Sequence, residues 1–252
     1  MEQQAMKKGK VFICGAGPGD PKLITLRAME LLKTCDVILY DRLVGKEIVD
    51  QMPEGAEKVY VGRTVGDPTT HQDRTNELMA GYAKKGKRVL RLKGGDPFIF
   101  GRGAEEAEYL IERGIAFEIV PGVTSAIASP AYAGIPLTHR RHSSSVAIVT
   151  GHEGAEKDEL AVRWDRLAGA VDTIVVMMGI GQLDQISRDL VKAGMKKGTR
   201  VAIVASGTTD KQRIVRGTLA TIAGVAKKAD VRPPAVIVIG RVAGLDNLEW
   251  FR

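Results

Sequence analysis

The chain has 252 residues, of which 44% are apolar, 27% charged and 5% aromatic, and its formal net charge is +7. A chain of this size can bury about 70% of its unfolded surface, and its composition excludes an intrinsically disordered protein. No apolar run approaches the roughly 20 residues that cross a bilayer, which excludes a transmembrane protein. The start, MEQQAMKKGK, lacks the apolar core of a secretory signal, and the two cysteines form no CxxC pair. We therefore expect a cytoplasmic protein.

Short apolar, β-branched runs alternate with helix-like segments along the first half of the chain. Five strands are expected there, with a helix at 25–34 whose apolar residues recur at helical spacing. The expected strands are Val11–Cys14, Val37–Tyr40, Val59–Val61, Val89–Leu92 and Glu118–Val120. Strands that alternate with helices are typical of an α/β protein with a largely parallel sheet.

The second half repeats this rhythm with one difference. Its expected strands are Ser145–Thr150, Thr173–Met177, Arg200–Val204, Arg213–Arg216 and Ala235–Ile239. The turn-rich stretch Ala205–Lys211 can join two of these strands as a hairpin. We therefore expect the second sheet to be mixed rather than wholly parallel.

A stretch rich in Pro, Gly, Ser and Ala, Pro121–Ser144, separates the two halves. It predicts an N-terminal α/β domain at 1–122, a linker at 123–144 and a C-terminal α/β domain at 145–252. A cleft between two such domains is the usual place for a small ligand.

The positive net charge is consistent with a basic solvated surface or with an anionic ligand. Nucleic-acid binding would require aromatic residues among the basic ones, for base stacking. The basic runs Lys7–Lys10, Lys84–Arg88 and Lys227–Lys228 have almost none nearby. A polyanionic small molecule is therefore favoured over nucleic acid, and nothing suggests a membrane partner.

The first glycine-rich motif, Gly15–Pro21, directly follows the first expected strand. Its first two glycines fit the dinucleotide fingerprint G-x-G-x-x-G, and Asp41 supplies an acidic residue at the right distance. The third glycine is replaced by Asp20, whose charge would oppose a pyrophosphate. An N-cap at Asp20, with Pro21 opening the helix, explains both residues as well. A nicotinamide- or flavin-dependent oxidoreductase remains the alternative.

The second motif, LKGGDPFIFGRG at Leu92–Gly103, follows the fourth expected strand. Ligands bind outside the carboxyl ends of parallel strands, and adjacent glycines would expose main-chain groups there. The small hydroxyl residues of Val123–Ala126 could bind a polar ligand tail, or could simply cap a helix. His139 and His142 flank two arginines in what we expect to be an exposed turn, so no metal site is expected.

Three stretches of the chain resemble the tetrapyrrole methylase family. They are VFICGAGPGDPKLITLRAMELLKTCDVILYDRLV, VLRLKGGDPFIFGRGAEE and VPGVTSAIASPAYAGIPLTHR, and the resemblance extends to the final PPAVIVIGRV. Within the family, GGDPFIFGRG is typical of members that methylate uroporphyrinogen III. The resemblance implies two α/β domains with mixed, mostly parallel sheets and S-adenosylmethionine folded between them. It also implies methylation at C2 and C7 to give precorrin-2, for sirohaem or cobalamin synthesis, with S-adenosylhomocysteine released.

The resemblance further implies a homodimer and a set of cofactor contacts. Because the first expected strand begins at residue 11, we expect the single-function form, without the fused dehydrogenase/ferrochelatase domain of some relatives. The residues that match the family's S-adenosylmethionine contacts are Pro18, Gly94, Gly95, Asp96, Ile99, Thr124, Ser125, Met178, Gly207 and Ala235.

Asp41 matches the family position proposed as the general base that removes a ring proton after methyl transfer. The neighbouring Arg42 could hold it ionised. Stabilisation of a cationic ring is an alternative role, and a turn cap before Leu43 is a structural one.

Arginines are the expected partners of the substrate's carboxylates. The family usually has lysine, proposed as a proton donor, where this chain has Arg63. Guanidinium keeps its proton in proteins, so Arg63 is expected to bind a carboxylate instead. We expect the same of Arg91 and Arg102, the alternative being that they pair with protein carboxylates such as Glu105. A second departure, Ala205-Ser206 in place of Glu-Asn, removes the side-chain contacts that those two family residues could make.

Overall fold

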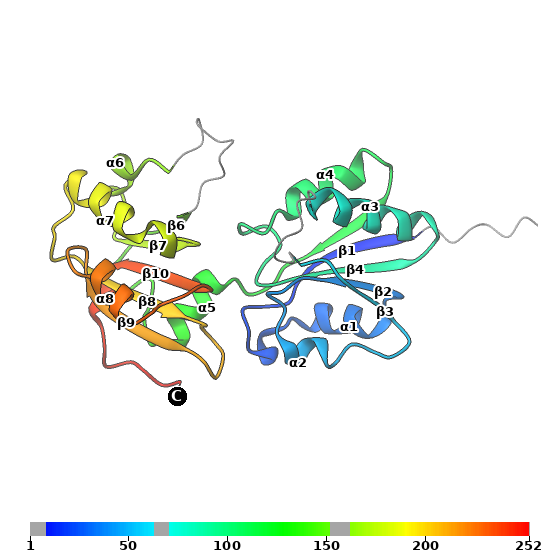
Figure 1. Ribbon diagram of the computed structural model, residues 1–252, viewed down its shortest axis with the longest axis horizontal. Helices are drawn as coiled ribbons and strands as arrows, with labels where there is room; N and C mark the ends of the chain where they lie inside the picture. Colours follow the sequence, from blue (N-terminus) through cyan, green and yellow to red (C-terminus); the bar gives the residue numbers. More distant parts are fainter. Residues whose placement is uncertain (1–8, 63–70, 152–161, 252) are drawn as a thin grey trace, which may run out of the picture. The chain divides into compact units, whose positions relative to one another are not determined.

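The computed structural model describes residues 9–62, 71–151 and 162–251. The chain divides into two compact units, Met1–Thr124 and Ser125–Arg252, and each is described by itself (Figure 1). The division falls inside the segment 123–144, which the sequence suggested as a linker. Residues from Ser125 onward pack as part of the second unit.

The first unit is built on a five-stranded parallel sheet with the order β3-β2-β4-β1-β5. Its strands are β1 (Lys10–Gly15), β2 (Val37–Tyr40), β3 (Glu57–Tyr60), β4 (Arg88–Lys93) and β5 (Ala116–Val120). Its helices are η1 (Pro21–Leu23), α1 (Leu26–Thr34), α2 (Lys46–Val49), α3 (His71–Lys84) and α4 (Gly103–Ile111). The parallel sheet confirms the expectation for this half, and the bounds of β2 are those predicted.

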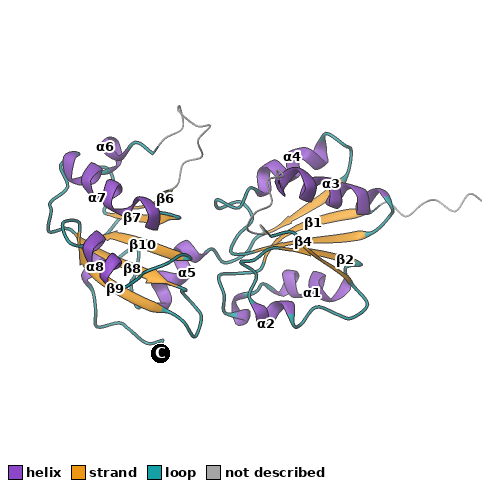
Figure 2. Ribbon diagram, viewed as in Figure 1, coloured by secondary structure: helices purple, strands orange, loops and turns teal. Residues whose placement is uncertain are grey.

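Helices cover both faces of this sheet (Figure 2). Because side chains alternate along a strand, Phe12 and Cys14 of β1 join the core cluster beneath α1 and α2. Val11 and Ile13 join the cluster beneath α3 and α4 on the opposite face. Both faces are therefore buried, as is usual for a parallel sheet.

The turn after β1 is capped as the sequence suggested. Asp20 Oδ1 accepts a hydrogen bond of 2.8 Å from the main-chain N–H of Lys22, and Pro21 is the first residue of η1. Thr25 then caps α1, because its Oγ1 accepts a bond of 3.2 Å from the N–H of Ala28. Asp20 thus begins a helical turn at the position of the third glycine of a dinucleotide fingerprint.

The second unit has a five-stranded mixed sheet with the order β6-β7-β10-β8-β9. Its strands are β6 (Val146–Thr150), β7 (Thr173–Met177), β8 (Arg200–Ala205), β9 (Arg213–Thr218) and β10 (Ala235–Gly240). Its helices are α5 (Ser125–Tyr132), α6 (Trp164–Leu167), η2 (Ile180–Gln182), α7 (Leu183–Lys192), α8 (Ile222–Lys228) and η3 (Arg241–Gly244). Among the described strands of this sheet, only β6 and β7 pair in parallel, and β8 and β9 form the expected hairpin. The prediction of a mixed second sheet is confirmed.

One face of this sheet packs under α7 and α8, through residues such as Ile186, Ile203 and Ile222. The other face packs against α5, where Ala126 meets Val175 and Val236. In the described part of the chain, no helix has the length and apolar character needed to span a membrane.

Candidate functional site

In the sheet of the first unit, the helices that follow two neighbouring strands pack on opposite faces. β1 leads through α1, which packs on the face of Phe12, whereas β4 leads through α4, which packs on the face of Val11. β1 and β4 are adjacent in the sheet. Ligands of open α/β sheets bind outside the carboxyl ends of the strands at such a point. Both glycine-rich motifs begin here.

The loops after β1, β4 and β5 pack main chain against main chain. Gly17 and Gly95 form a two-bond bridge, with N···O distances of 3.2 Å and 2.7 Å. A Cβ on Gly15 would lie 2.5 Å from the carbonyl oxygen of Gly95, and one on Gly122 would lie 2.3 Å from it. Gly95 itself has a φ of +69°. Only glycine permits such close approach, and glycine adopts this backbone conformation without strain.

This packing changes the expected role of two predicted cofactor contacts. The N–H and C=O groups of Gly95, expected to face a ligand, bond to Gly17 instead. Asp96 accepts main-chain bonds on both carboxylate oxygens, at 2.8 Å from Phe98 N on Oδ1 and at 3.0 Å from Gly122 N on Oδ2. Both residues therefore hold the loops together. Gly94 does so for a further loop, since a Cβ there would lie 2.5 Å from Cβ of Leu43.

Backbone strain occurs in loops that follow strands of each unit. Of the six non-glycine residues with positive φ in the described ranges, two lie in the loop after β4, one follows β7 and two follow β8. These five are Phe100, Arg102, Met178, Ser206 and Thr208. Strained conformations persist where the surrounding structure enforces them, often in binding sites. Ile99 and Phe100 are also exposed, which places apolar side chains at the edge of the first unit's loop.

Asp41 follows β2 at the same edge of the first sheet. Its Oδ1 accepts a bond of 3.0 Å from Leu43 N, so the suggested turn cap exists. Its Oδ2 accepts a bond of 3.3 Å from Nη2 of Arg91, and the side chain is 23% exposed. The cation bonded to Asp41 is therefore Arg91 rather than the expected Arg42. One carboxylate both caps a turn and presents charge at the sheet edge.

Arg91 does not present its guanidinium to solvent. Its side chain is only 6% exposed, and its Nε donates to Oε1 of Glu106 at 3.0 Å. The structure thus shows the alternative for this residue, a pairing with protein carboxylates, and the partners are Glu106 and Asp41 instead of Glu105. The physical reason is its place in the central strand β4, where an unpaired charge would be costly.

Glu106 and Lys93 complete this buried cluster, and the sequence analysis missed both. The Lys93 ammonium lies 2.9 Å from the same Oε1, and the Glu106 side chain is 0% exposed. Burial lowers the pKa of Lys93, and Arg91 lowers it further. Burial opposes ionisation of Glu106, but the charges of Arg91 and Lys93 outweigh it and lower its pKa. Two basic residues alternating with leucines in a buried strand were the signal that a buried acidic partner must exist.

Arg102 and Arg63 are the remaining arginines predicted to bind substrate. Arg102 is 57% exposed and lies 3.6 Å from Glu105. Exposed pairs of this kind contribute little to stability, so this guanidinium can exchange its partner. Arg63 lies outside the described residues.

The predicted contacts of the second unit gather at one edge of its sheet. Met178 follows β7 and Gly207 follows β8, while Ala235 begins the antiparallel β10 between them. The register pairs Ala235 with Ala205, the last residue of β8. A Cβ on Gly207 would lie 2.3 Å from Oγ of Ser129, so this turn packs closely on α5, which begins at Ser125. Thr124 is buried at the end of the first unit, and Pro18 lies between the Gly17 bridge and the Asp20 cap.

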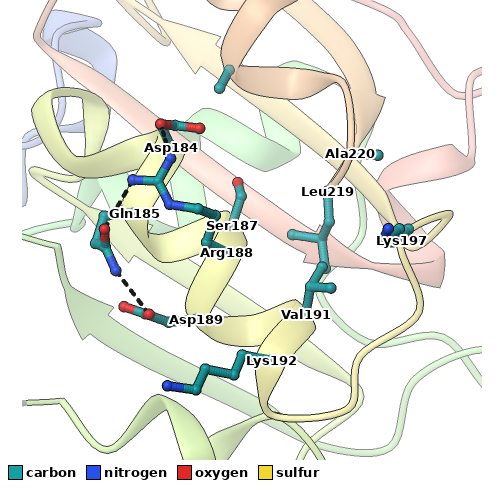
Figure 3. A pocket seen from close by; sticks show the side chains of 11 residues that line it. Asp184, Gln185, Ser187, Arg188, Asp189, Val191, Lys192, Lys197, Leu219 and Ala220 are labelled. Carbon is teal, nitrogen blue, oxygen red and sulfur yellow. Dashed lines mark hydrogen bonds and ion pairs between the residues drawn. The ribbon is translucent and has the colours of Figure 1, made fainter.

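A separate hollow of about 650 Å³ lies on the second unit beside α7 (Figure 3). Its polar side chains bond along the helix, as Arg188 does to Asp184 and Gln185. Gln185 in turn donates to Asp189 at 2.8 Å. None of the predicted site residues lines it. We therefore regard it as the solvated outer face of α7.

Comparisons with known proteins identify the family that the chain resembles. Residues 10–223 match the tetrapyrrole (corrin/porphyrin) methylases. An S-adenosyl-L-methionine-dependent uroporphyrinogen III methyltransferase of Methanosarcina barkeri is 49% identical over 240 residues, 95% of this chain and 94% of its own. A siroheme synthase of Pseudoalteromonas atlantica is 46% identical over 252 residues, and the chain spans only 54% of that longer protein.

A solved structure is also similar. It is the uroporphyrin-III C-methyl transferase of Thermus thermophilus complexed with S-adenyl homocysteine, with a TM-score of 0.79 and 40% identity. The match covers 93% of this chain and 98% of that one. In the described part of the chain, no group of three or more His, Cys, Asp or Glu side chains could hold a metal ion.

Proposed function

Because the chain belongs to the tetrapyrrole methylase family, we propose that it transfers methyl groups from S-adenosylmethionine to C2 and C7 of uroporphyrinogen III. The product is precorrin-2, a precursor for sirohaem and cobalamin. The observation that carries this proposal is the 49% identity, over nearly the full length of both chains, to a methyltransferase named for this substrate. The similar structure with S-adenyl homocysteine supports the choice of methyl donor.

The chemistry of the described residues fits S-adenosylmethionine. When bound, this cofactor supplies an electrophilic methyl group, so the residues around it must not be methylated themselves. A thiolate is the side chain most reactive toward such a group, and Cys14 lies directly before Gly15. Cys14 is fully buried, and burial raises the pKa of its thiol to about 12. The thiol therefore stays protonated and inert at neutral pH.

The residues proposed to hold the cofactor come from both units. The close-packed loops of the first unit offer main-chain groups on a rigid base, and Thr124 and Ser125 offer hydroxyl groups. Met178, Gly207 and Ala235 contribute from the sheet edge of the second unit. Holding a donor and an acceptor in line accounts for several kcal/mol of a transfer barrier, about 7 or more in favourable cases. The full proposed set is Pro18, Gly94, Gly95, Asp96, Ile99, Thr124, Ser125, Met178, Gly207 and Ala235.

Asp41 is proposed to complete the reaction as a base. Methylation of a ring carbon leaves the electron-rich ring cationic, and loss of a proton restores neutrality. The Asp41 carboxylate is partly exposed, and Arg91 and Leu43 N orient it. A carboxylate at this place can accept the proton or stabilise the cation.

The basic side chains at the site are proposed to bind the acidic substrate. Arg102 is exposed and only loosely paired, so it can bind a substrate carboxylate, and we propose the same for Arg63. Arg91 is buried, and each of its three guanidinium nitrogens bonds to the protein, so we assign it no direct substrate contact. We further propose that the enzyme is cytoplasmic, as its composition suggests, and a homodimer, as the family resemblance implies. Light scattering on the purified protein tests the dimer.

The function is tested by incubating the protein with uroporphyrinogen III and S-adenosylmethionine. Mass spectrometry is expected to show a product with two added methyl groups, and absorbance the spectrum of oxidised precorrin-2. Reactions that lack either substrate serve as controls. A product with one or no added methyl group, under saturating cofactor, rejects the assignment.

A further inference from the structure

Glu106 is a buried carboxylate to which the proposed function gives no role. Its side chain is 0% exposed, and its Oε1 accepts three hydrogen bonds, from Arg91 at 3.0 Å, Lys93 at 2.9 Å and Gln72 at 3.1 Å. Its Oε2 is buried and has no hydrogen-bond partner among the described residues. Burying such a charge is costly, and apolar residues of similar volume often serve stability as well. A role of Glu106 beyond stability must therefore lie in the side chains to which it is hydrogen-bonded.

Arg91 connects Glu106 to Asp41. Its Nε donates to Glu106, while its Nη2 donates to Asp41 at 3.3 Å. Because the guanidinium is planar and rigid, fixing one side of it fixes the direction of the other. Glu106 thus determines where the cation that orients Asp41 can lie.

The charges of this cluster balance. Arg91 and Lys93 approach Glu106 from β4, and the neutral Gln72 of α3 donates to it as well as to Asn76 of the same helix. Asp41, in the loop after β2, is the second carboxylate. Without Glu106, two buried cations would act on Asp41 alone and make its carboxylate a weaker base. Without Lys93, Glu106 would take a larger share of the positive charge, and Asp41 would become more basic.

We propose that Glu106 is a positioning residue of methyl transfer, which acts through Arg91 to orient Asp41 and to set its strength as a proton acceptor. The proposal rests on the proposed function in one respect, namely that Asp41 accepts the ring proton. The effect of Glu106 on the protonation of Asp41 can be measured without any substrate.

The first experiment follows protonation of Asp41 directly. The protein is labelled with ¹³C at the aspartate carboxyl carbons, and the Asp41 resonance is assigned with Asp41→Asn. Relative to the unsubstituted protein, the midpoint of its change with pH is expected to move down in Glu106→Gln and up in Lys93→Met. The double variant removes one charge of each sign, so its midpoint is expected close to the original.

The second experiment links this change to turnover. Glu106→Gln is expected to lower kcat about 10-fold and to move the acidic limb of its pH profile to lower pH, with an unchanged Kd for S-adenosylhomocysteine. The double variant is expected to recover the position of the limb. Glu108→Gln makes the same substitution at an exposed position of α4 and should change neither kcat nor the position of the acidic limb.

The outcomes separate the possible failures. Loss of stability with an unmoved Asp41 midpoint and pH limb would make the cluster merely structural and overturn the proposal. A shift of the Asp41 midpoint in the same direction in Glu106→Gln and Lys93→Met would also overturn the proposal. If Glu106→Gln does not fold, two other variants test the proposal. The Asp41 midpoint must move up in Lys93→Met and return close to its original value in the double variant. An unsubstituted protein that leaves uroporphyrinogen III unmethylated rejects the proposed function, whatever the resonance does.

Discussion

The carboxylate of Asp96 accepts a hydrogen bond of 3.0 Å from the main-chain N–H of Gly122, 26 residues further along the chain. The bond joins the loop after β4 to the loop after β5, beside the contact between Gly95 and Gly122. A residue expected to touch the cofactor is thus also a brace between two binding loops.

Asp96→Ala is expected to weaken binding of S-adenosylhomocysteine at least 10-fold, because the loop after β5 loses its anchor. A hydrogen bond to a charged group contributes about 1.5 to 3 kcal/mol, and the substitution removes two such bonds, so a loss of stability is expected as well. Isothermal titration calorimetry and thermal unfolding measure the two effects. Asp96→Asn retains one acceptor oxygen, so its affinity should lie between those of the unsubstituted protein and Asp96→Ala. Unchanged affinity in Asp96→Ala would show that the bond between the two loops does not matter for binding.

Gly95→Val is expected to abolish measurable cofactor binding. Its φ of +69° is strained for any β-branched residue, and the loops after β1 and β5 pack against it. Gly81→Val is the matched control, because a Cβ on this α3 residue meets nothing within 4 Å. Calorimetry with S-adenosylhomocysteine should separate the two variants, and equal affinities would contradict the role of the Gly95 backbone.

Asp41→Asn is expected to lower turnover about 100-fold or more, the scale of general-base catalysis. The amide keeps the shape of the side chain and can still cap Leu43, but it has neither charge nor basicity. Cofactor affinity should change little. Single-turnover kinetics with saturating S-adenosylmethionine give the rate, and near-normal turnover would leave Asp41 only its turn cap.

Arg102→Ala is expected to raise the KM for uroporphyrinogen III roughly 10-fold, the scale of one lost charge-assisted hydrogen bond. The Kd for S-adenosylhomocysteine should stay the same. Arg188→Ala, which removes an exposed arginine from α7, controls for the change in net charge. An unchanged KM would assign Arg102 to its pairing with Glu105.

Cys14 makes stability depend on alkaline pH. Burial raises the pKa of its thiol from 9.0 to about 12, so the unfolded chain loses this proton at a lower pH than the folded protein. The contribution to stability is complete below pH 9 and is lost as pH rises toward 12. Near pH 10.5 the loss is about 2 kcal/mol. Urea unfolding at several pH values should show a shallower alkaline decline in Cys14→Ala, and parallel declines would contradict this.

The fold could be predicted largely from local patterns. The strands at Val37–Tyr40 and Thr173–Met177 have the predicted bounds because both are continuous, largely buried runs in the sheet interior. The bounds of β3 were wrong for the opposite reason. It lies at the edge of the sheet and pairs only with β2, so the polar Glu57 and Lys58 can belong to it. A pattern of apolar residues does not detect such positions.

The site could be predicted only in part, because partners come from other segments. Glu105 and Glu106 are adjacent and equally acidic in the sequence, yet one is exposed and the other fully buried. The difference arises from Arg91 and Lys93, which extend from β4 toward α4. Arg91 was expected to bind substrate because its carboxylate partners, 50 residues before it and 15 after it, cannot be seen locally.

The bridge between Gly17 and Gly95 has a consequence for the energetics of recognition. Loops that order only when a ligand arrives lose conformational entropy at that moment, which weakens the complex. Here two loops from distant parts of the chain are hydrogen-bonded to each other in an antiparallel bridge, just beyond the ends of the parallel strands β1 and β4. Because these loops become ordered when the protein folds, a ligand does not have to order them when it binds. Its interaction energy can therefore contribute to affinity and to alignment of the reacting groups.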